Sequence, residues 1–332
     1  MSSQWRMTRY RTADTGNDIF ELTHDPLPEL GEGDVEVRLD WLSVDPGMTG
    51  WVTDKRSYMP PVRPGGVMRA FGVGEVVESR FEGLQPGDWV TGFTGMQTDA
   101  VLRGKHLRRI DTTLAPPNHY LSGLGMTGYT AYFGMSDIGR PQPGQTVVVS
   151  AAAGAVGSVA AQVAKLAGAR VVGIAGGPVK CAYLTDTLGL DGAIDYKGED
   201  VGGALDRECP DGIDVYFDNV GGDILDAVLS RITYRATLVI CGAISQYADW
   251  HAQNGPRNYT ALITQSATMR GFTMKDYMHR IPEAVAALSE AQAAGDIVFR
   301  EHVVEGIEAF PDAFDMLFTG GNHGKLLIKV RP

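Results

Sequence analysis

The chain has 332 residues, 44% of them hydrophobic and 21% charged, as expected for a soluble globular protein with two domains. Its 29 Lys and Arg against 40 Asp and Glu give a net charge of −11, which disfavours binding to nucleic-acid phosphates. The N-terminus has no apolar signal segment, and the most apolar stretch, about residues 146–175, is interrupted by glycines and charges. Three scattered cysteines fit a reducing compartment, so we expect a cytoplasmic protein. From the net charge and the interrupted apolar stretch we expect no nucleic-acid or membrane partner.

Residues 1–110 alternate short β-type runs with turn signals made of Pro, Gly and Asp. The predicted strands include Val35–Leu39, Gly74–Glu78 and Trp89–Phe93. This part of the chain therefore predicts a compact, mostly antiparallel β domain.

From about Leu121, helical stretches alternate with short strands rich in Val, Ile and Ala, and Gly157–Ala167 has the spacing of a packed helix. The predicted strands are Gln145–Ser150, Arg170–Ala175, Ala193–Tyr196, Val215–Asn219 and Thr237–Cys241. Strands with helical crossovers at this spacing predict a parallel, doubly wound sheet, and hence an α/β fold.

The C-terminal third predicts helices and strands that follow the α/β region. They are a helix over Pro282–Ala294, a strand over Val298–Glu305, a helix over Pro311–Phe318 and a strand over Leu326–Val330. The last strand can return to the β domain, which would make the domains discontinuous in sequence.

A glycine-containing loop follows the first strand of the α/β region and precedes its first helix. In the register of the dinucleotide-binding pattern, Ala152 takes the first glycine position, and Gly154 and Gly157 take the second and third. Gly154 would let the backbone approach a pyrophosphate, and Gly157 would let the helix pack close to the strand. The helix N-terminus would supply N–H donors. A tight turn without a ligand is the alternative interpretation.

The segment after the next strand, about twenty residues on, contains no carboxylate to pair with the ribose 2′-hydroxyl of NAD. It reads Ala175-Gly-Gly-Pro-Val-Lys180, and Lys180 at the start of a helix is suited to pair with a 2′-phosphate. This pattern favours NADPH over NADH, with a surface lysine as the alternative. Tyr196, at the end of the following strand, is placed to lie over the adenosine side of the same site.

The sequence does not predict a zinc site. Catalytic zinc takes three ligands from Cys, His, Asp and Glu, and structural zinc often takes four cysteines. The three cysteines form no CxxC pair, and the seven histidines are scattered with no HxxxH pair. Alcohol oxidation would then need another device to hold an alkoxide, whereas reduction of an enone needs only hydrogen-bond donors and a proton for the enolate.

Seven motifs, spread over almost the whole chain, give it a family resemblance. They are Leu42–Pro46, Ser57–Pro61, Gly125–Phe133, Ala151–Gly157, Tyr216–Gly222, Cys241–Tyr247 and Gly321–Lys325. With these motifs the chain resembles the zinc-independent medium-chain reductases called prostaglandin reductases, leukotriene B4 12-hydroxydehydrogenases or alkenal/one oxidoreductases. Bacterial curcumin reductase and plant double-bond reductases are similar.

The resemblance implies a GroES-like substrate domain over residues 1–124, a Rossmann NADPH-binding domain over 125–299, and a return to the first domain over 300–332. It implies NADPH-dependent reduction of the C=C bond of α,β-unsaturated ketones and aldehydes, with hydride added to the β-carbon. Relatives are often homodimers. The cofactor contacts carried over are Met126, Thr127, Gly154, Ala155, Val156, Gly157, Lys180, Tyr196, Asn219, Cys241, Gly242, Ala243, Ile244, Ser245, Tyr247, Phe272, Thr273, Met274 and Asn322.

The resemblance also makes Tyr247 the candidate catalytic residue. A phenol is ordinarily a hydrogen-bond donor at neutral pH, so Tyr247 could stabilise the developing enolate or supply its proton. The alternative is that Tyr247 only supports the nicotinamide and that solvent protonates the α-carbon.

One segment departs from the family pattern. After Asp45-Pro46 the family often has Tyr-Met-Arg, whereas this chain has Gly47-Met-Thr49. Loss of a ring and a guanidinium predicts a more open pocket and a substrate other than a long-chain eicosanoid. Trp51 and Tyr58, from nearby loops, are candidates to line the pocket with Gly47, although isolated aromatic residues can equally serve packing.

Three alternative functions remain at the level of sequence. An NADPH:quinone oxidoreductase would use the same fold and cofactor, and a non-catalytic NADPH-binding protein would bind the cofactor without turnover. An AdoMet methyltransferase also uses a glycine-containing loop, but Lys180 and the motifs outside the α/β region disfavour it.

Overall fold

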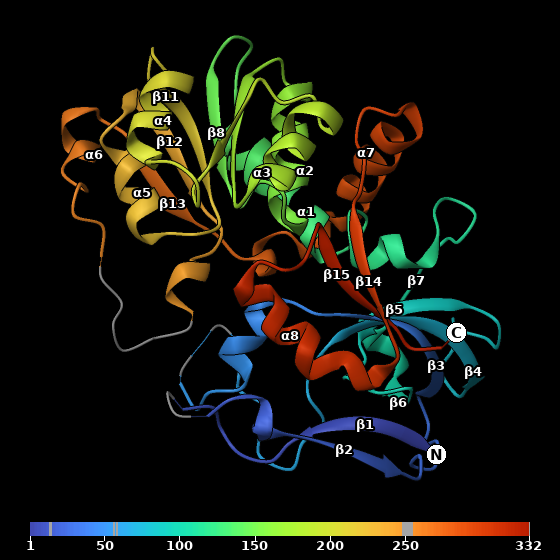
Figure 1. Cartoon of the computed structure of the whole chain (residues 1–332). Helices are drawn as coiled ribbons and strands as arrows, with labels where there is room; N and C mark the ends of the chain where they lie inside the picture. The colour runs from blue at the N-terminus through green and yellow to red at the C-terminus, as the bar shows by residue number, and fades with distance from the viewer. Residues whose placement is uncertain (13–14, 56, 58, 248–254, 332) are drawn as a thin grey trace. The chain divides into compact units, whose positions relative to one another are not determined.

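The protein is described from a computed structural model, and the description is given for residues 1–12, 15–55, 57, 59–247 and 255–331. The described chain forms two compact units. The first unit contains Met1–Leu121, Glu301–Asn322 and Leu326–Pro332, and the second contains Ser122–Arg300 and His323–Lys325. Figure 1 shows the helices and strands of both.

The first unit is built from a hairpin and a seven-stranded sheet. The hairpin pairs β1 (Ser2–Met7) with β2 (Phe20–Asp25). The sheet has the order β14-β15-β3-β4-β5-β7, and β6 also pairs with β3. Its strands are β3 (Asp34–Ser43), β4 (Phe71–Ser79), β5 (Trp89–Phe93), β6 (Asp99–Arg103), β7 (Arg108–Arg109), β14 (Glu301–Glu305) and β15 (Lys325–Lys329).

The core of the first unit follows from alternation along its strands and from one amphipathic helix. In β3, Val35, Val37 and Leu39 are fully buried, because side chains two residues apart share a face of the sheet. Helix α8 (Phe310–Thr319) buries Phe310 and Phe314, one turn apart, against this core. The C-terminal segment thus completes a unit that the N-terminal residues begin.

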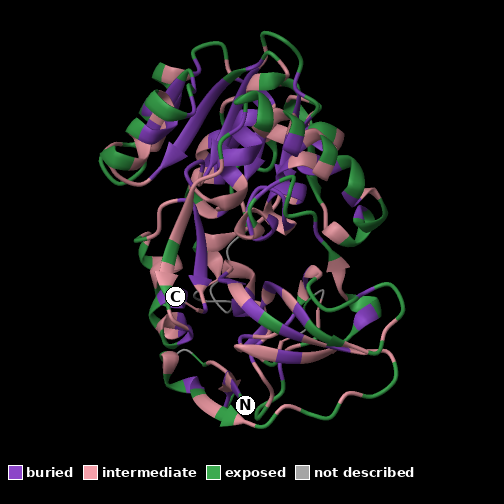
Figure 2. Ribbon diagram, turned by 90° about the vertical axis from the view of Figure 1, so that its right-hand side faces the viewer, coloured by how far each residue is buried: buried purple, intermediate pink, exposed green. Residues whose placement is uncertain are grey.

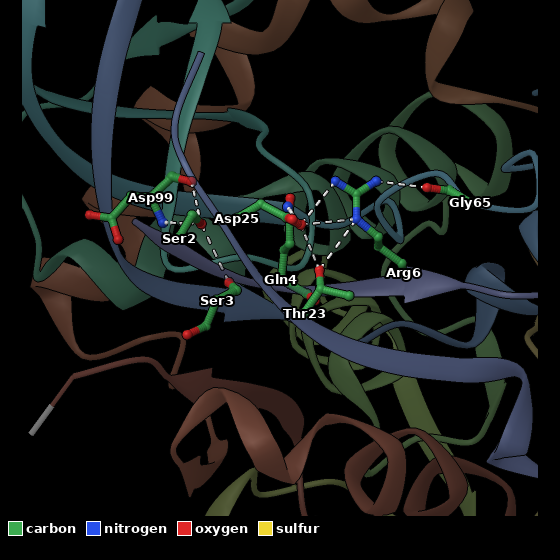
Figure 3. Close-up of polar contacts among 8 residues, drawn as sticks. All are labelled: Ser2, Ser3, Gln4, Arg6, Thr23, Asp25, Gly65 and Asp99. Atoms are coloured by element: carbon green, nitrogen blue, oxygen red, sulfur yellow. Dashed lines mark hydrogen bonds and ion pairs between the residues drawn. The ribbon is translucent and has the colours of Figure 1, made fainter.

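A polar network anchors the N-terminal hairpin (Figure 3). The Arg6 guanidinium donates to the carboxylate of Asp25 on the facing strand and, at 2.7 Å, to the carbonyl oxygen of Gly65. Thr23 and Gln4 also donate to Asp25, and these two bonds, in that order, hold the pKa of the carboxyl below its usual value. The network fixes the register of two strands that the sequence analysis did not predict.

The second unit contains a six-stranded parallel sheet with the order β10-β9-β8-β11-β12-β13. Its strands are β8 (Thr146–Ser150), β9 (Arg170–Ala175), β10 (Gly192–Asp195), β11 (Ile213–Asp218), β12 (Ile232–Ile240) and β13 (Thr268–Gly271). Its helices are α1 (Met126–Phe133), α2 (Ala155–Leu166), α3 (Pro178–Ala182), α4 (Val201–Glu208), α5 (Gly222–Leu229), α6 (Ala261–Thr264) and α7 (Ile281–Ala294).

The inner strands β8, β9 and β11 of this sheet are mostly buried, the edge strand β13 is exposed, and the helices that cover the sheet expose their outer faces (Figure 2). One face packs against α4 and α5 through a cluster that includes Val148, Ile174, Leu205 and Leu229. Burial on both faces explains why these strands read as continuous Val and Ile runs. The strand order reverses between β8 and β11, and a ligand crevice of this fold forms outside the carboxyl ends of the strands at that point.

The predicted fold class is confirmed, but several strand boundaries were wrong. The strand predicted over Thr237–Cys241 is β12, which begins at Ile232 and ends at Ile240. The predicted strand Val298–Glu305 begins only at Glu301 as β14. The side-chain amide of Gln162 donates to the carbonyl oxygen of Val298 at 3.0 Å and accepts from its N–H at 2.8 Å. A side chain therefore takes the backbone bonds that a neighbouring strand would have made.

None of the helices in the described part of the chain combines the length and apolar character needed to cross a membrane.

Candidate functional site

The glycine-containing loop joins β8 to α2 at the carboxyl edge of the parallel sheet. Gly154 is the N-cap of α2, and Ala155 and Val156 form its first turn. The first N–H groups of a helix have no intrahelical acceptor, so this end offers donors and a positive dipole to an anion. A Cβ at Gly157 would lie 2.3 Å from the carbonyl oxygen of Ala151, so only glycine fits there.

The loop is supported from a distant part of the chain. Gly154 forms a parallel β-bridge with Gly324, and the N–H of Lys325 donates to the carbonyl oxygen of Arg300 at 2.8 Å. Asn322, predicted to contact the cofactor, precedes this bridge by two residues and belongs to the first unit.

Positive charges gather beyond the carboxyl end of β9. Lys180 lies in α3 and is half-buried. Burial lowers the pKa of its amine, and repulsion from Lys197 and then Arg300 lowers it further. The Arg300 guanidinium also lies over the ring of Tyr183, 4.5 Å from its centroid, and lines a surface hollow with Val179. A phosphate placed among these cations would relieve their mutual repulsion.

Tyr196 and Asp195 border the same region from the end of β10. The Tyr196 ring packs against Gly176, where a Cβ would come within 2.8 Å of it. The Asp195 carboxylate accepts from the N–H of Gly177 at 2.7 Å and of Lys197 at 3.0 Å, and these bonds, the first most, lower its pKa. No carboxylate follows β9, but the neighbouring strand β10 does end in one, that of Asp195. Backbone N–H groups hold this carboxylate.

Asn219 follows β11 at the point where the strand order reverses. Its backbone N–H donates to the Ser150 hydroxyl at 2.9 Å, and its side-chain amide donates to the Ser150 carbonyl oxygen at 2.8 Å. The ends of β8 and β11 are thereby fixed to each other. Ser150 was not among the residues predicted from the sequence, because its partners lie about seventy residues away.

The segment Cys241–Tyr247 follows β12 and folds back on itself. The N–H of Ala243 donates to the hydroxyl oxygen of Tyr247 at 3.2 Å, and a Cβ on Gly242 would lie 3.3 Å from that oxygen. Ile244 and Ser245 lie in the short helix Ile244–Gln246. Burial raises the pKa of the Cys241 thiol to about 12, which makes it a poor nucleophile at neutral pH.

The remaining predicted cofactor residues of the second unit lie at two more positions. Met126 and Thr127 begin α1, and the Thr127 hydroxyl donates to the carbonyl oxygen of Ser122 at 2.9 Å. Phe272, Thr273 and Met274 follow β13. The predicted cofactor residues thus lie just after the carboxyl ends of strands of one parallel sheet, in the loop or at the start of the helix that follows. The exceptions are Met126, Thr127 and Asn322.

The predicted pocket residues of the first unit lie on the short helix Pro46–Trp51. Gly47 is half-buried there, and Trp51 is 4% exposed and belongs to the hydrophobic core. Trp51 packs edge-on against Phe93, with the Arg69 guanidinium 5.1 Å from its ring centroid. Tyr58 lies outside the described residues.

Within the described part of the chain, no group of three or more His, Cys, Asp or Glu residues is arranged to hold a metal ion.

The chain matches known oxidoreductases along most of its length. A family model described as the N-terminal domain of oxidoreductase matches residues 3–110, and one described as zinc-binding dehydrogenase matches residues 155–290. The described residues of this chain do not fit the zinc ion that the second description implies. The matches define a two-part oxidoreductase whose second part carries most of the parallel sheet.

Three relatives of known sequence cover nearly the whole chain. YfmJ of Bacillus subtilis (strain 168) is 48% identical over 319 residues, which is 95% of this chain and 93% of the relative. An NADPH-dependent curcumin reductase of Escherichia coli (strain K12) is 40% identical, covering 94% and 92%. A 2-alkenal reductase (NADP(+)-dependent) of Nicotiana tabacum is also 40% identical, covering 92% and 89%.

A solved structure is similar over the same extent. The crystal structure of CurA in complex with NADPH from Vibrio vulnificus has a TM-score of 0.94 and 38% identity, covering 99% of each chain. The chain belongs to the medium-chain dehydrogenase/reductase family.

Proposed function

We propose that this protein uses NADPH to reduce the C=C double bond of α,β-unsaturated ketones and aldehydes. The observation that carries the proposal is the end-to-end similarity, at 40% identity, to a curcumin reductase and a 2-alkenal reductase. The cations around Lys180 support NADPH as the cofactor, as does the NADPH complex of the similar Vibrio structure.

The residues of the second unit fit this cofactor. The N-terminus of α2 and the bare backbone at Gly154 suit the pyrophosphate, because a side chain there would take up the space of the anion. Lys180, with Lys197 and Arg300 nearby, suits the 2′-phosphate. Tyr196 borders the adenosine side, and the segments that begin at Asn219, Cys241 and Phe272 lie along the same sheet edge. When bound, NADPH supplies a hydride for the β-carbon of the substrate.

The chain itself must stabilise the enolate that forms and deliver a proton to the α-carbon. We assign the first task to the hydroxyl of Tyr247, whose oxygen is held by the N–H of Ala243. A positioned donor of this kind stabilises developing negative charge on the carbonyl oxygen. The proton for the α-carbon then comes from Tyr247 or from solvent.

The substrate pocket is proposed to include Gly47. In its segment Met48 and Thr49 are buried, and the Thr49 hydroxyl donates to the carbonyl oxygen of Pro46 at 2.7 Å. The Thr49 hydroxyl is therefore engaged with its own turn, and a threonine, being neutral, presents no cation to an acidic substrate. This favours small or aryl enones over long-chain carboxylic acids.

The test is a steady-state assay of NADPH oxidation with small enals, cyclic enones, aryl enones and quinones. We expect turnover with enones, and a saturated ketone as the product by mass spectrometry. With NADPH that carries deuterium at nicotinamide C4, the label should appear at the β-carbon. Turnover with quinones alone would support a quinone oxidoreductase, and NADPH binding without any turnover would support a non-catalytic protein. Either result overturns the proposal.

Replacement Tyr247→Phe tests the role of the hydroxyl. Positioned donors and general acids commonly contribute about 10²–10³ in rate. We therefore expect kcat to fall about 100-fold, while the Kd of NADPH changes no more than about threefold. Tyr234→Phe removes a hydroxyl from an exposed tyrosine and should leave both values unchanged. An unchanged kcat in Tyr247→Phe would leave the residue only a supporting role.

We also propose that the protein is a cytoplasmic homodimer that pairs through β13. This strand lies at the edge of the parallel sheet, and all four of its residues are exposed. Edge strands pair readily with another chain, and a lysine on the edge discourages this. Light scattering should give twice the chain mass at micromolar concentration, and Met269→Lys should shift it toward the monomer. A monomeric mass for the unmodified chain contradicts the proposal.

A further inference from the structure

The carboxylate of Asp218 is buried at the carboxyl end of β11. Its side chain is almost inaccessible, and its Oδ1 accepts four hydrogen bonds. The donors are the Ser150 hydroxyl at 3.1 Å, the Tyr216 hydroxyl at 2.9 Å, and the N–H groups of Val220 and Gly221 at 2.9 Å each. None of these donors is a cation.

The backbone of Asp218 holds a third strand end. Its carbonyl oxygen accepts from the N–H of Cys241 at 2.9 Å and of Gly242 at 3.0 Å, both of which follow β12. Ser150, which donates to the Asp218 carboxylate, ends β8 and accepts from the N–H of Asn219. One residue therefore connects the ends of β8, β11 and β12, the strands on both sides of the reversal in strand order.

Two loops depend on this connection. The first is the turn Asn219–Gly222, in which Gly221 and Gly222 have φ values of 69° and 57° that favour glycine. The second is the segment Cys241–Tyr247. The Val220 carbonyl oxygen accepts from the Ser245 hydroxyl at 2.6 Å and from its N–H at 3.2 Å, which fastens the second loop to the first.

Packing alone does not account for a carboxylate at this position. Burial raises the pKa of Asp218, and the N–H groups of Gly221 and Val220 and the hydroxyls of Tyr216 and Ser150 oppose that change. Burial of a carboxylate without a cation costs free energy that an apolar side chain of similar size would not cost. The two loops held by Asp218 contain seven of the nineteen residues proposed to contact the cofactor.

We propose that Asp218 is a positioning residue. Its side chain holds Asn219–Gly222 directly, and Cys241–Tyr247 through the bonds of Ser245 to Val220, in the conformation that receives NADPH. The inference rests on the proposed NADPH site. Asp218 acts through the loops, because its own side chain is buried. Its loss should therefore weaken cofactor binding and lower turnover.

The experiment compares Asp218→Ala and Asp218→Asn with a matched control on the same strand. Asp214, near the other end of β11, accepts from the N–H of Thr146 at 2.8 Å and from the Thr233 hydroxyl at 2.7 Å. Asp214 is half-buried, and Asp214→Ala therefore removes a hydrogen-bond acceptor of the same strand away from the carboxyl edge. The Kd of NADPH is measured by calorimetry, its KM and kcat by steady-state assay, and folding by thermal unfolding.

We expect Asp218→Ala to raise the Kd and KM of NADPH about tenfold or more, and Asp214→Ala to leave them within about twofold even if it lowers Tm. Asp218→Asn should recover at least threefold of the lost affinity, because the amide oxygen can accept the same four donors. If Asp218→Ala does not fold, Ser150→Ala removes one of those donors and should raise KM at least threefold.

Several results would overturn the inference. The first is wild-type affinity for NADPH in folded Asp218→Ala or, if that variant is unfolded, in Ser150→Ala. The second is an equal loss of NADPH affinity in Asp214→Ala. The third is no recovery of NADPH affinity in Asp218→Asn. If the unmodified protein itself does not bind NADPH, the proposed function fails instead. The two failures are thus distinguished by the wild-type titration.

Discussion

Lys180→Ala is expected to weaken NADPH binding about 10- to 100-fold and to leave NADH binding nearly unchanged. Hydrogen bonds to charged groups are worth about 1.5–3 kcal/mol, and about 1.4 kcal/mol corresponds to a factor of ten in affinity. Only NADPH carries the 2′-phosphate that Lys180 is proposed to bind. The preference is measured as the ratio of the two Kd values by calorimetry, with Lys105→Ala, an exposed lysine of the first unit, as control. Equal losses for both cofactors would remove Lys180 from the 2′-phosphate site.

The same lysine predicts a pH dependence of the preference. Burial, Lys197 and Arg300 lower the pKa of Lys180 in the free protein, and a bound phosphate would raise it again. NADPH therefore binds the protonated amine of Lys180. The preference for NADPH over NADH is thus complete below the pKa that Lys180 has in the free protein. It is lost as the pH rises through the higher pKa of the complex. In Lys180→Ala the ratio of Kd values should no longer follow this dependence.

Gly157→Ala is expected to destabilise the second unit and to abolish most cofactor binding. Inside a helix, alanine is ordinarily favoured over glycine by about 1 kcal/mol, so propensity alone would predict a more stable protein. The new Cβ would however lie 2.3 Å from the carbonyl oxygen of Ala151, in a turn where Ala151 already has φ of 47°. The N-terminus of α2 must then move away from β8, which displaces the proposed pyrophosphate donors.

Thermal unfolding and an NADPH titration test this expectation. Gly16→Ala is the matched control, because no atom lies within 4 Å of a Cβ built there. We expect a lower Tm and at least a tenfold weaker Kd in Gly157→Ala, and neither change in the control. A higher Tm with normal affinity would show that helix propensity outweighs the close contact.

The α/β half of the fold could be predicted because its signals are local. Strands buried on both faces give continuous Val and Ile runs, and β9 was predicted with both ends correct, at Arg170 and Ala175. The hairpin of β1 and β2 was missed, because its apolar residues do not alternate strictly and its register depends on contacts such as that of Arg6 with Gly65. The backbone bonds of Val298 with Gln162 likewise join positions too far apart in sequence to be inferred from either one.

The residues of the candidate site likewise divide into those with a local sequence signal and those without one. Gly154, Gly157 and Lys180 could be identified because a strand–loop–helix pattern assigns a role to each position. Asp218 could not, because a carboxylate at the end of a strand is usually exposed, and its burial arises only when three strand ends meet. Arg300 could not be connected to Lys180 either, because 120 residues separate them in the chain. Its charge becomes relevant only through the folded structure.

The contact between Gly176 and Tyr196 bears on how the cofactor preference could be redesigned. An engineer seeking an NADH-dependent variant would introduce an acidic side chain after β9 to pair with the ribose hydroxyls. At Gly176 the first atom of any such side chain would lie 2.8 Å from the Tyr196 ring. A single substitution there has to displace an aromatic ring before it can offer a carboxylate. A second substitution, with a smaller residue replacing Tyr196, would remove this contact.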